Sequence, residues 1–346
     1  MAREKWLVDP AQLDKFQRDI LTISVNDSCL VKGCAGSGKT ILALYRANDI
    51  YQQAKAAGKS ASFTMIIYTR ALQSFIQSGI KELGIGPRQV IYAKKWDGSL
   101  VDHIIIDEAQ DFTKTEIDEF LAASNVSIML YGDTQQQIYD GRMSTEAIAT
   151  HLKLPSIELL KNYRLPKLIA AFASHIGMDK ELENKCVKTG FEKPKLKKFN
   201  HWQEEIDFIF KEIETRNHTD VAILLPFNDK TGGPYNNFHR NIQSVREHLD
   251  NHGYRYEYKI NDSLVLDFDS ELPKLITFHS SKGLQFETVF IPFFDYPGHD
   301  RWFIGNYQMP LYVALTRTYR NLYLTYTERL TPFFYGVPLS KYELIP

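Results

Sequence analysis

The sequence has few cysteines, no long apolar run and almost no net charge. Its three cysteines, Cys29, Cys34 and Cys186, form no CxxC pair and no metal-ligand spacing, which favours a reducing compartment over a disulfide framework. The segment MAREKWLVDPAQLDKF lacks the apolar core of a secretion signal, and no stretch of about 18 consecutive apolar residues occurs. The formal net charge of −1 gives no overall basic field, although a local groove can still bind phosphates. These absences predict a soluble, cytoplasmic protein.

The 346 residues suffice for two or three domains. Near-continuous apolar segments, typical of strands in a parallel sheet covered on both faces, occur in two sets: 28–33, 62–69, 102–107 and 126–133, then 220–227, 274–280, 288–294 and 321–327. Helical patterns lie between them at 40–57, 115–124, 238–252 and 307–320. The polar and basic segment 185–200 is interpreted as a connection. The alternation predicts two similar α/β domains in tandem.

The segment GCAGSGKT (33–40) lies between an apolar strand and a helical pattern. Gly33, Gly36 and Gly38 would let backbone N–H groups, including that of Ser37, turn toward an anion, and the positive end of the following helix would strengthen the field there. In this loop pattern the amine of Lys39 reaches the β- and γ-phosphates, and the hydroxyl of Thr40 ligates Mg²⁺. The motif predicts a nucleotide site.

The segment IIIDEAQDF (104–112) places two carboxylates directly after an apolar strand. A carboxylate in such a place needs a cation or another compensating charge. We therefore expect Asp107 to hold Mg²⁺ through its hydration shell and Glu108 to polarise the attacking water. The alternative is an acidic cluster that simply favours the start of a helix. Together with the phosphate loop, the segment predicts hydrolysis of ATP or GTP.

DEAQD (107–111) and six further segments resemble, in the same order, the motifs of superfamily 1 helicases of the UvrD/Rep type. The six are LDKFQRDI (13–20), YTRALQSFI (68–76), YGDTQQQIY (131–139), KNYR (161–164), ITFHSSKGLQF (276–286) and LYVALTRT (311–318). The resemblance implies two tandem RecA-like P-loop domains with parallel sheets and the ATP site at their interface. Residues 1–158 would form the ATP-binding domain, and residues 159–346 would form the domain that supplies arginine fingers.

The resemblance also implies roles for single residues. Gln17 would read the adenine edge, Tyr163 would stack on adenine, and Gly283 would also lie against the nucleotide. Gln136 would sense the γ-phosphate, while Arg164 and Arg317 would stabilise the charge that builds on the phosphoryl oxygens during transfer. Contacts with nucleic acid are implied for a further set: Thr69, Arg70, Tyr139, Thr277, His279 and Lys282.

The chain departs from that family in several places. Only 36 residues separate Arg70 from Asp107, and 112 separate Arg164 from Thr277, so neither gap has room for the large inserted subdomains that are usual in the family. Gly141 replaces a base-stacking aromatic residue, and such stacking contributes about 1–3 kcal/mol per base. Gln285 stands where a glutamate is usual, and GNYQMP (305–310) replaces an acidic run.

Two functions therefore stay open. The first is an ATP- and Mg²⁺-dependent translocase or helicase on nucleic acid, with single-stranded DNA favoured over RNA. The second is a regulatory ATPase that switches a protein partner, such as a nuclease or another effector of a multi-protein phage-defence system, without unwinding duplex.

Other features have plainer interpretations. The aromatic-rich segment 302–327 fits core packing better than base stacking. KPKLKK (193–198) is interpreted as a solvated linker, with phosphate contacts as the alternative. The ten histidines show no metal-ligand spacing.

Overall fold

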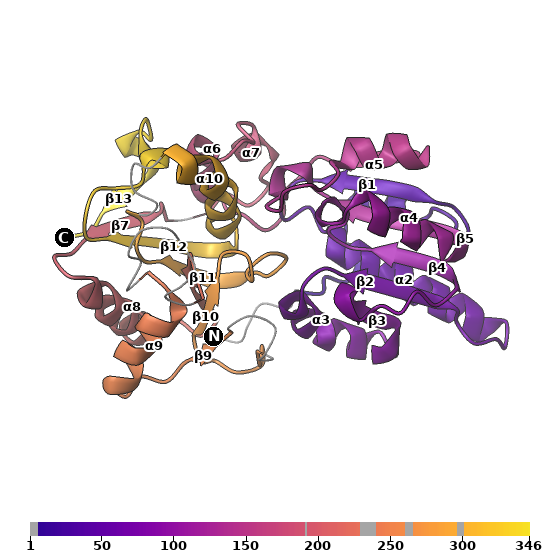
Figure 1. Cartoon of the computed structure of the whole chain (residues 1–346), viewed down its shortest axis with the longest axis horizontal. Coiled ribbons are helices and arrows are strands. Elements are labelled where there is room, and N and C mark those ends of the chain that lie inside the picture. Colours follow the sequence, from indigo (N-terminus) through magenta and orange to yellow (C-terminus); the bar gives the residue numbers. More distant parts are fainter. Residues whose placement is uncertain (1–5, 191, 229–239, 260–265, 296–300) are drawn as a thin grey trace. The chain divides into compact units, whose positions relative to one another are not determined.

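The computed structural model describes residues 6–190, 192–228, 240–259, 266–295 and 301–346, and the side chains of 78, 87 and 301–306 are not among what it describes. The chain forms two compact units, divided between Tyr163 and Arg164. We call Glu4–Tyr163 the N-terminal unit and Arg164–Pro346 the C-terminal unit (indigo to magenta and rose to yellow in Figure 1). No helix in the described ranges is both long and apolar enough to cross a bilayer.

The N-terminal unit is built on a six-stranded, wholly parallel sheet (Figure 1). Its strands, in spatial order, are β3 (Val90–Tyr92), β2 (Phe63–Ile67), β4 (Val101–Ile106), β5 (Ser124–Gly132), β1 (Cys29–Gly33) and β6 (Ser156–Leu159). The helices are α1 (Lys15–Leu21), α2 (Lys39–Ala56), α3 (Arg70–Glu82), α4 (Lys114–Ala122) and α5 (Thr145–Leu152). Short 3-10 helices are η1 (Pro10–Gln12), η2 (Pro87–Gln89), η3 (Ala93–Lys95), η4 (Ala109–Asp111) and η5 (Thr134–Gln136). Between Arg70 and Asp107 the chain thus adds only α3, the strands β3 and β4, and the 3-10 helices η2 and η3, so no large subdomain is inserted there, as the short gap predicts.

The C-terminal unit has a seven-stranded sheet, again parallel in every pair (Figure 1). Its order is β13 (Glu343–Leu344), β7 (Lys195–Lys198), β12 (Thr318–Tyr326), β11 (Phe286–Ile291), β8 (Val221–Leu225), β10 (Lys274–Thr277) and β9 (Glu257–Tyr258). The helices are α6 (Lys167–Ile176), α7 (Leu182–Lys185), α8 (Trp202–Arg216), α9 (Ile242–Asn251) and α10 (Arg301–Leu315), with 3-10 helices η6 (Pro332–Phe334) and η7 (Leu339–Lys341).

Two parallel α/β sheets confirm the expected fold class of two tandem RecA-like domains. The apolar segments form strands because both faces of each sheet are covered, so almost every side chain of the central strands is buried. All eight predicted strand positions are confirmed within a few residues. In the described part of the aromatic-rich segment, Tyr312 and Tyr323 pack in the core as expected, since each is only 1% exposed.

The interpretation of KPKLKK (193–198) as a solvated linker is wrong. Lys195–Lys198 is strand β7, which pairs with both β12 and β13 inside the second sheet. Leu196 is buried, and the stem of Lys195 is buried too, with its Nζ 2.6 Å from a Glu192 carboxylate oxygen and 5.0 Å above the Tyr323 ring. Lysine stems can cover apolar surface while the charged end finds a partner, so a basic run here forms a strand.

Two helix predictions need correction at their ends. The predicted helix 307–320 stops at Leu315, and Thr318 already begins β12. The predicted helix 238–252 begins at Ile242, where the Asn241 side chain caps it by accepting from the Ser244 amide at 2.8 Å. Residues 238 and 239 of that prediction lie outside the described residues, as does residue 191 of the segment 185–200.

Candidate nucleotide site

The loop between β1 and α2 has a backbone that requires glycine. Gly36 and Gly38 have φ angles of 74° and 93°, a region that strains residues with a side chain. A Cβ on Gly38 would also lie 2.6 Å from Nε2 of Gln17. Gly38 is the N-cap of α2 and provides no capping side chain, so the first N–H groups of this 18-residue helix remain available to an anion.

The amine of Lys39 lies over the same loop. It is buried and donates to the carbonyl oxygens of Gly33, at 2.7 Å, and Cys34, at 3.1 Å. A buried ammonium needs such acceptors. The Ser37 hydroxyl, buried beside it, has no hydrogen-bond partner among the described residues. A phosphate in the loop would give both groups an anionic acceptor.

The hydroxyl of Thr40, on the first turn of α2, meets the first carboxylate after β4. Thr40 Oγ1 donates to Asp107 Oδ2 at 2.7 Å, and Asp107 is fully buried. Burial, and secondly the neighbouring Glu108, raise the pKa of Asp107 to about 7, against the opposing effects of Thr40 and Lys39. A hydroxyl and a carboxylate this close match the few protein oxygens that Mg²⁺ takes when phosphate and water supply the rest.

Glu108 has a strained backbone with a φ angle of 55°. Its amide donates to Asp107 Oδ1 at 3.0 Å, and its own carboxylate accepts from Gln110 Nε2 at 2.6 Å. Glu108 precedes η4 but makes no side-chain capping bond. Glu108 thus stands at the start of a three-residue 3-10 helix, as the alternative expects, but its carboxylate is bonded to the Gln110 side chain and not to the amides of that helix. Strain that the surroundings hold in place is typical of functional positions.

Gln110 and Asp133 connect Glu108 to Gln136. Gln110 Oε1 accepts from the Asp133 amide at 2.9 Å, and Asp133 Oδ2 accepts from Gln136 Nε2 at 2.6 Å. All of these side chains are buried. Burial raises the pKa of Asp133, while the Lys39 charge acts in the opposite direction. Gln110 and Asp133 were not predicted as site residues, although they lie inside the segments DEAQD and YGDTQQQIY.

On the other side of the loop, Gln17 and Tyr163 are held by one acidic residue. Asp14 and Gln17 form the capping box of α1, and Gln17 Nε2 donates to the Ser37 carbonyl at 2.9 Å. The Tyr163 hydroxyl donates to the Asp14 carboxylate, and the Tyr163 amide donates to the Gly36 carbonyl at 3.0 Å. Gln17 and Tyr163, the two residues expected to contact adenine, are thus both hydrogen-bonded to the phosphate loop. Asp14, which links them, was not predicted.

Three residues expected to contact nucleic acid lie in the N-terminal unit, after the carboxyl ends of β2 and β5. Thr69 caps α3 by accepting from the Leu72 amide at 3.1 Å, and the Arg70 guanidinium lies 5.5 Å from the centre of the Tyr92 ring. The Tyr139 ring packs 5.0 Å from that of Tyr68. Gly141 has a φ angle of 70°, and a Cβ there would meet nothing within 4 Å.

The remaining predicted residues lie in the C-terminal unit. Thr277 ends β10, and its Oγ1 accepts from the Ser280 amide at 3.1 Å. In the turn that follows, His279 is exposed, Lys282 is buried, and Gly283 has a φ angle of 79°. Arg317 is buried just after α10, where it donates to the Val313 carbonyl at 2.8 Å and the Thr316 hydroxyl at 3.0 Å. Arg164, half-buried, begins the unit.

Comparison with known proteins gives several helicase relatives. Residues 26–197 match a model of the family "Schlafen group 3, DNA/RNA helicase domain". The chain is 25% identical over 257 residues to "Probable DNA helicase" of Mycoplasma pneumoniae, and 26% identical over 252 residues to "Putative ATP-dependent DNA helicase R568" of Acanthamoeba polyphaga mimivirus. Each match covers 65% of this chain, but only 43% and 34% of the respective relative.

Among solved structures, the nonstructural protein 10 (helicase) of an arterivirus matches 90% of this chain and 61% of its own, with 15% identity and a TM-score of 0.45. The family match and the two sequence relatives support a helicase superfamily for this chain.

Proposed function

We propose that this chain is the ATP-hydrolysing core of a cytoplasmic helicase or translocase that acts on single-stranded DNA, of the UvrD-like superfamily 1 type. The observation that carries the proposal is the convergence of Lys39, Thr40, Asp107 and Glu108 beside a loop whose amides can receive phosphate. The helicase relatives support the same activity.

In this proposal each residue has one role in phosphoryl transfer. The loop amides and Lys39 bind the phosphates, while Thr40 and Asp107 hold Mg²⁺, which neutralises phosphate charge when it is bound. Glu108 orients the attacking water and accepts its proton, and Gln110 fixes the Glu108 carboxylate through their 2.6 Å hydrogen bond. Gln136 would respond to the γ-phosphate through its bond to Asp133.

The roles proposed for Arg164, Arg317 and Gly283 rest on the resemblance of their segments to helicase motifs. Arg164 and Arg317 would stabilise charge on the transferred phosphoryl group, as arginines supplied from outside a P-loop domain commonly do. For Arg317 this requires the guanidinium to leave the Val313 carbonyl and the Thr316 hydroxyl. Nucleotide binding would then change the environment of the carboxyl end of α10.

Nucleic acid is the proposed substrate because the motif set resembles that of translocating helicases. Thr69, Arg70 and Tyr139 would contact the strand from the N-terminal unit, and Thr277, His279 and Lys282 from the C-terminal unit. Ser280 and the rest of the turn after β10 hold Thr277 in place.

Steady-state ATP hydrolysis with and without single-stranded DNA or RNA tests the proposal, with Lys39→Ala as the blank. We expect single-stranded DNA to raise the rate several-fold at low salt and less at high salt, because phosphate contacts weaken as salt rises. If neither DNA nor RNA changes the rate of the wild-type protein, the assignment to a strand-tracking motor is wrong.

The second candidate is a regulatory ATPase that switches a protein partner. It is favoured by two observations: the short gap between α3 and β4, and the empty space around Gly141, where a base-stacking side chain is missing. Gel filtration with the products of neighbouring genes, in ATP and in ADP, separates the candidates. A complex that depends on the nucleotide, together with strand-independent hydrolysis, favours the switch.

A further inference from the structure

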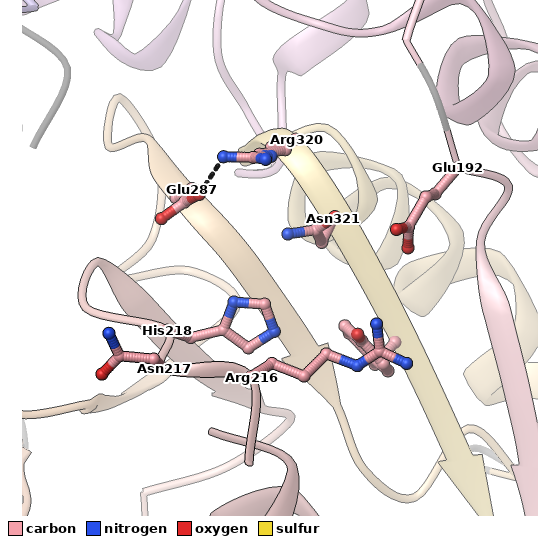
Figure 2. A pocket seen from close by; sticks show the side chains of 8 residues that line it. Glu192, Arg216, Asn217, His218, Glu287, Arg320 and Asn321 are labelled. Atoms are coloured by element: carbon pink, nitrogen blue, oxygen red, sulfur yellow. Dashed lines mark hydrogen bonds and ion pairs between the residues drawn. The ribbon is translucent and has the colours of Figure 1, made fainter. Parts of the chain in front are cut away.

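The C-terminal unit contains a pocket that plays no part in the proposed hydrolysis. It is a cavity of about 340 Å³ at the amino ends of β8, β11 and β12 (Figure 2). Thr277 and its turn follow the carboxyl end of β10, at the opposite edge of the same parallel sheet. Cavities of about 300–1,000 Å³ are typical of small-molecule sites, so the volume suits one small ligand or one nucleoside.

The charged groups around the pocket already neutralise one another. Arg320 Nη1 lies 2.8 Å from Glu287 Oε1, as the dashed line in Figure 2 shows. The Glu192 carboxylate has the Lys195 amine at 2.6 Å, and Arg216 is paired with Glu212 one turn earlier on α8. A ligand with a net charge would find each opposite charge here already paired. The lining therefore favours a neutral, polar ligand.

An anion is disfavoured for a second reason. Arg216 and Asn217, which line the pocket, are the last residue and the C-cap of α8. The carboxyl end of a helix carries a partial negative charge, which disfavours an anion beside it. Two arginines would otherwise suggest a phosphate site, but Arg216 and Arg320 are each paired with a carboxylate, and Arg216 lies at the carboxyl end of α8.

One hydrogen-bond donor at the pocket lacks an acceptor. Asn321 Nδ2 donates to the Thr288 hydroxyl oxygen at 3.0 Å, and that hydroxyl lies 3.2 Å from His218 Nδ1. Burial lowers the pKa of His218, so the ring is neutral near pH 7. When Thr288 donates its proton to Nδ1, the ring proton is on Nε2. Nε2 is buried and has no hydrogen-bond partner among the described residues.

We propose that this pocket binds a neutral nucleobase, presented either as a free nucleoside or as an unstacked base of a nucleic-acid strand. Its ring would accept a hydrogen bond from His218 Nε2–H, which a side-chain movement must first open to the pocket, because this atom is buried in the structure. The side-chain amides of Asn217 and Asn321 can each offer a donor and an acceptor to a base edge, and the planar guanidinium of Arg320 or Arg216 can stack on its face. Figure 2 shows His218 and Asn321 between the Arg320–Glu287 pair and Arg216.

The proposal does not depend on ATP hydrolysis, and its test measures ligand binding through the NMR signals of the His218 ring. The protein is labelled with ¹⁵N-histidine, and the His218 ring signals are identified by their loss in His218→Phe. The wild-type protein is titrated with cytidine, uridine, adenosine and guanosine, and separately with ribose, inorganic phosphate and glycine. Short single-stranded oligonucleotides form the last arm, which distinguishes a base on a strand from a free nucleoside.

We expect a saturable change in the His218 Nε2–H signal with at least one nucleoside or oligonucleotide, and none with ribose, phosphate or glycine. His218→Phe should raise the dissociation constant at least about tenfold. His252→Phe, which changes an exposed histidine on another helix end, should leave it unchanged. Asn217→Gly keeps the left-handed C-cap but removes the amide, and it should also weaken binding.

Three results would overturn the assignment. The first is the absence of a saturable His218 response to every nucleoside and oligonucleotide. The second is an equal response to phosphate or glycine, which would make the pocket an anion or zwitterion site. The third is unchanged nucleoside affinity in both His218→Phe and Asn217→Gly.

Discussion

Glu205 gives a pH-dependent prediction that can be worked out quantitatively. The residue lies on α8 and is fully buried in the C-terminal unit. Its Oε2 accepts from the Phe293 amide at 3.0 Å and from the Thr325 hydroxyl at 2.5 Å, while Oε1 has no hydrogen-bond partner in the described part of the chain. Burial raises the pKa of Glu205 from 4.5 to about 8, and these two hydrogen bonds only partly oppose it.

A carboxyl group whose pKa is raised in the folded state binds its proton more tightly there than in the unfolded chain. The stabilisation of the folded state by protonated Glu205 is therefore fully present below the unfolded pKa of 4.5, and it is lost as the pH rises to about 8. At about 1.36 kcal/mol per pKa unit, the whole difference corresponds to about 5 kcal/mol. Between about pH 5 and about pH 8.5 the expected loss is about 4 kcal/mol.

Glu205→Gln has the shape of the protonated side chain but cannot ionise. We expect its free energy of unfolding to exceed that of the wild type by only about 1 kcal/mol at about pH 5 and by about 5 kcal/mol at about pH 8.5. Urea unfolding followed by tryptophan fluorescence measures this, because Trp202 lies on α8 with its ring 6.3 Å from that of Phe293.

Glu214→Gln is the matched control, since it removes an exposed carboxylate from the same helix. It should follow the wild type at every pH. If the difference in unfolding free energy between Glu205→Gln and the wild type is the same at both pH values, the assignment of a buried, protonated Glu205 is refuted.

Two further predictions concern the nucleotide site. Gly38→Ala places a Cβ 2.6 Å from Gln17 Nε2 at a φ angle of 93°, so we expect at least about 1 kcal/mol of lost stability and weaker ATP binding by titration calorimetry; unchanged affinity would mean that the loop can relax. Asp14→Ala removes the capping box of α1 and the partner of the Tyr163 hydroxyl. It should cost about 0.5–2 kcal/mol in thermal unfolding and raise the dissociation constant for ATP, whereas Lys161→Ala, which removes only an ion pair to Asp14, should do neither.

The fold was largely predictable because its signals are local. A strand covered on both faces must be apolar along its length, as Leu30–Val31 and Ile104–Ile106 are. Strand β7 was not predicted because a run of lysines usually indicates a solvent-exposed segment. In the folded chain the Lys195 amine contacts the Glu192 carboxylate and the Tyr323 ring. The periodicity of the sequence does not predict these contacts.

Some residues of the candidate site could likewise be predicted from the sequence, and others could not. Lys39 and Thr40 follow from the spacing within one loop, and the carboxylate of Asp107 was expected beside them; the 2.7 Å bond between Thr40 and Asp107 agrees with that placement. The roles of Asp14 and Gln110 depend on Tyr163 and Asp133, which are distant in sequence. Hydrogen bonds between residues so far apart in the sequence can be identified only once the order of the strands in the sheet is known.

The central claim is that Glu108 activates water beside ATP held by the loop and Lys39. Its most direct test measures ATP binding and ATP turnover separately in Glu108→Gln. We expect wild-type affinity for ATP and a turnover at least about 100-fold lower, as loss of a general base typically causes. A Glu108→Gln protein that hydrolyses ATP at the wild-type rate would contradict the account.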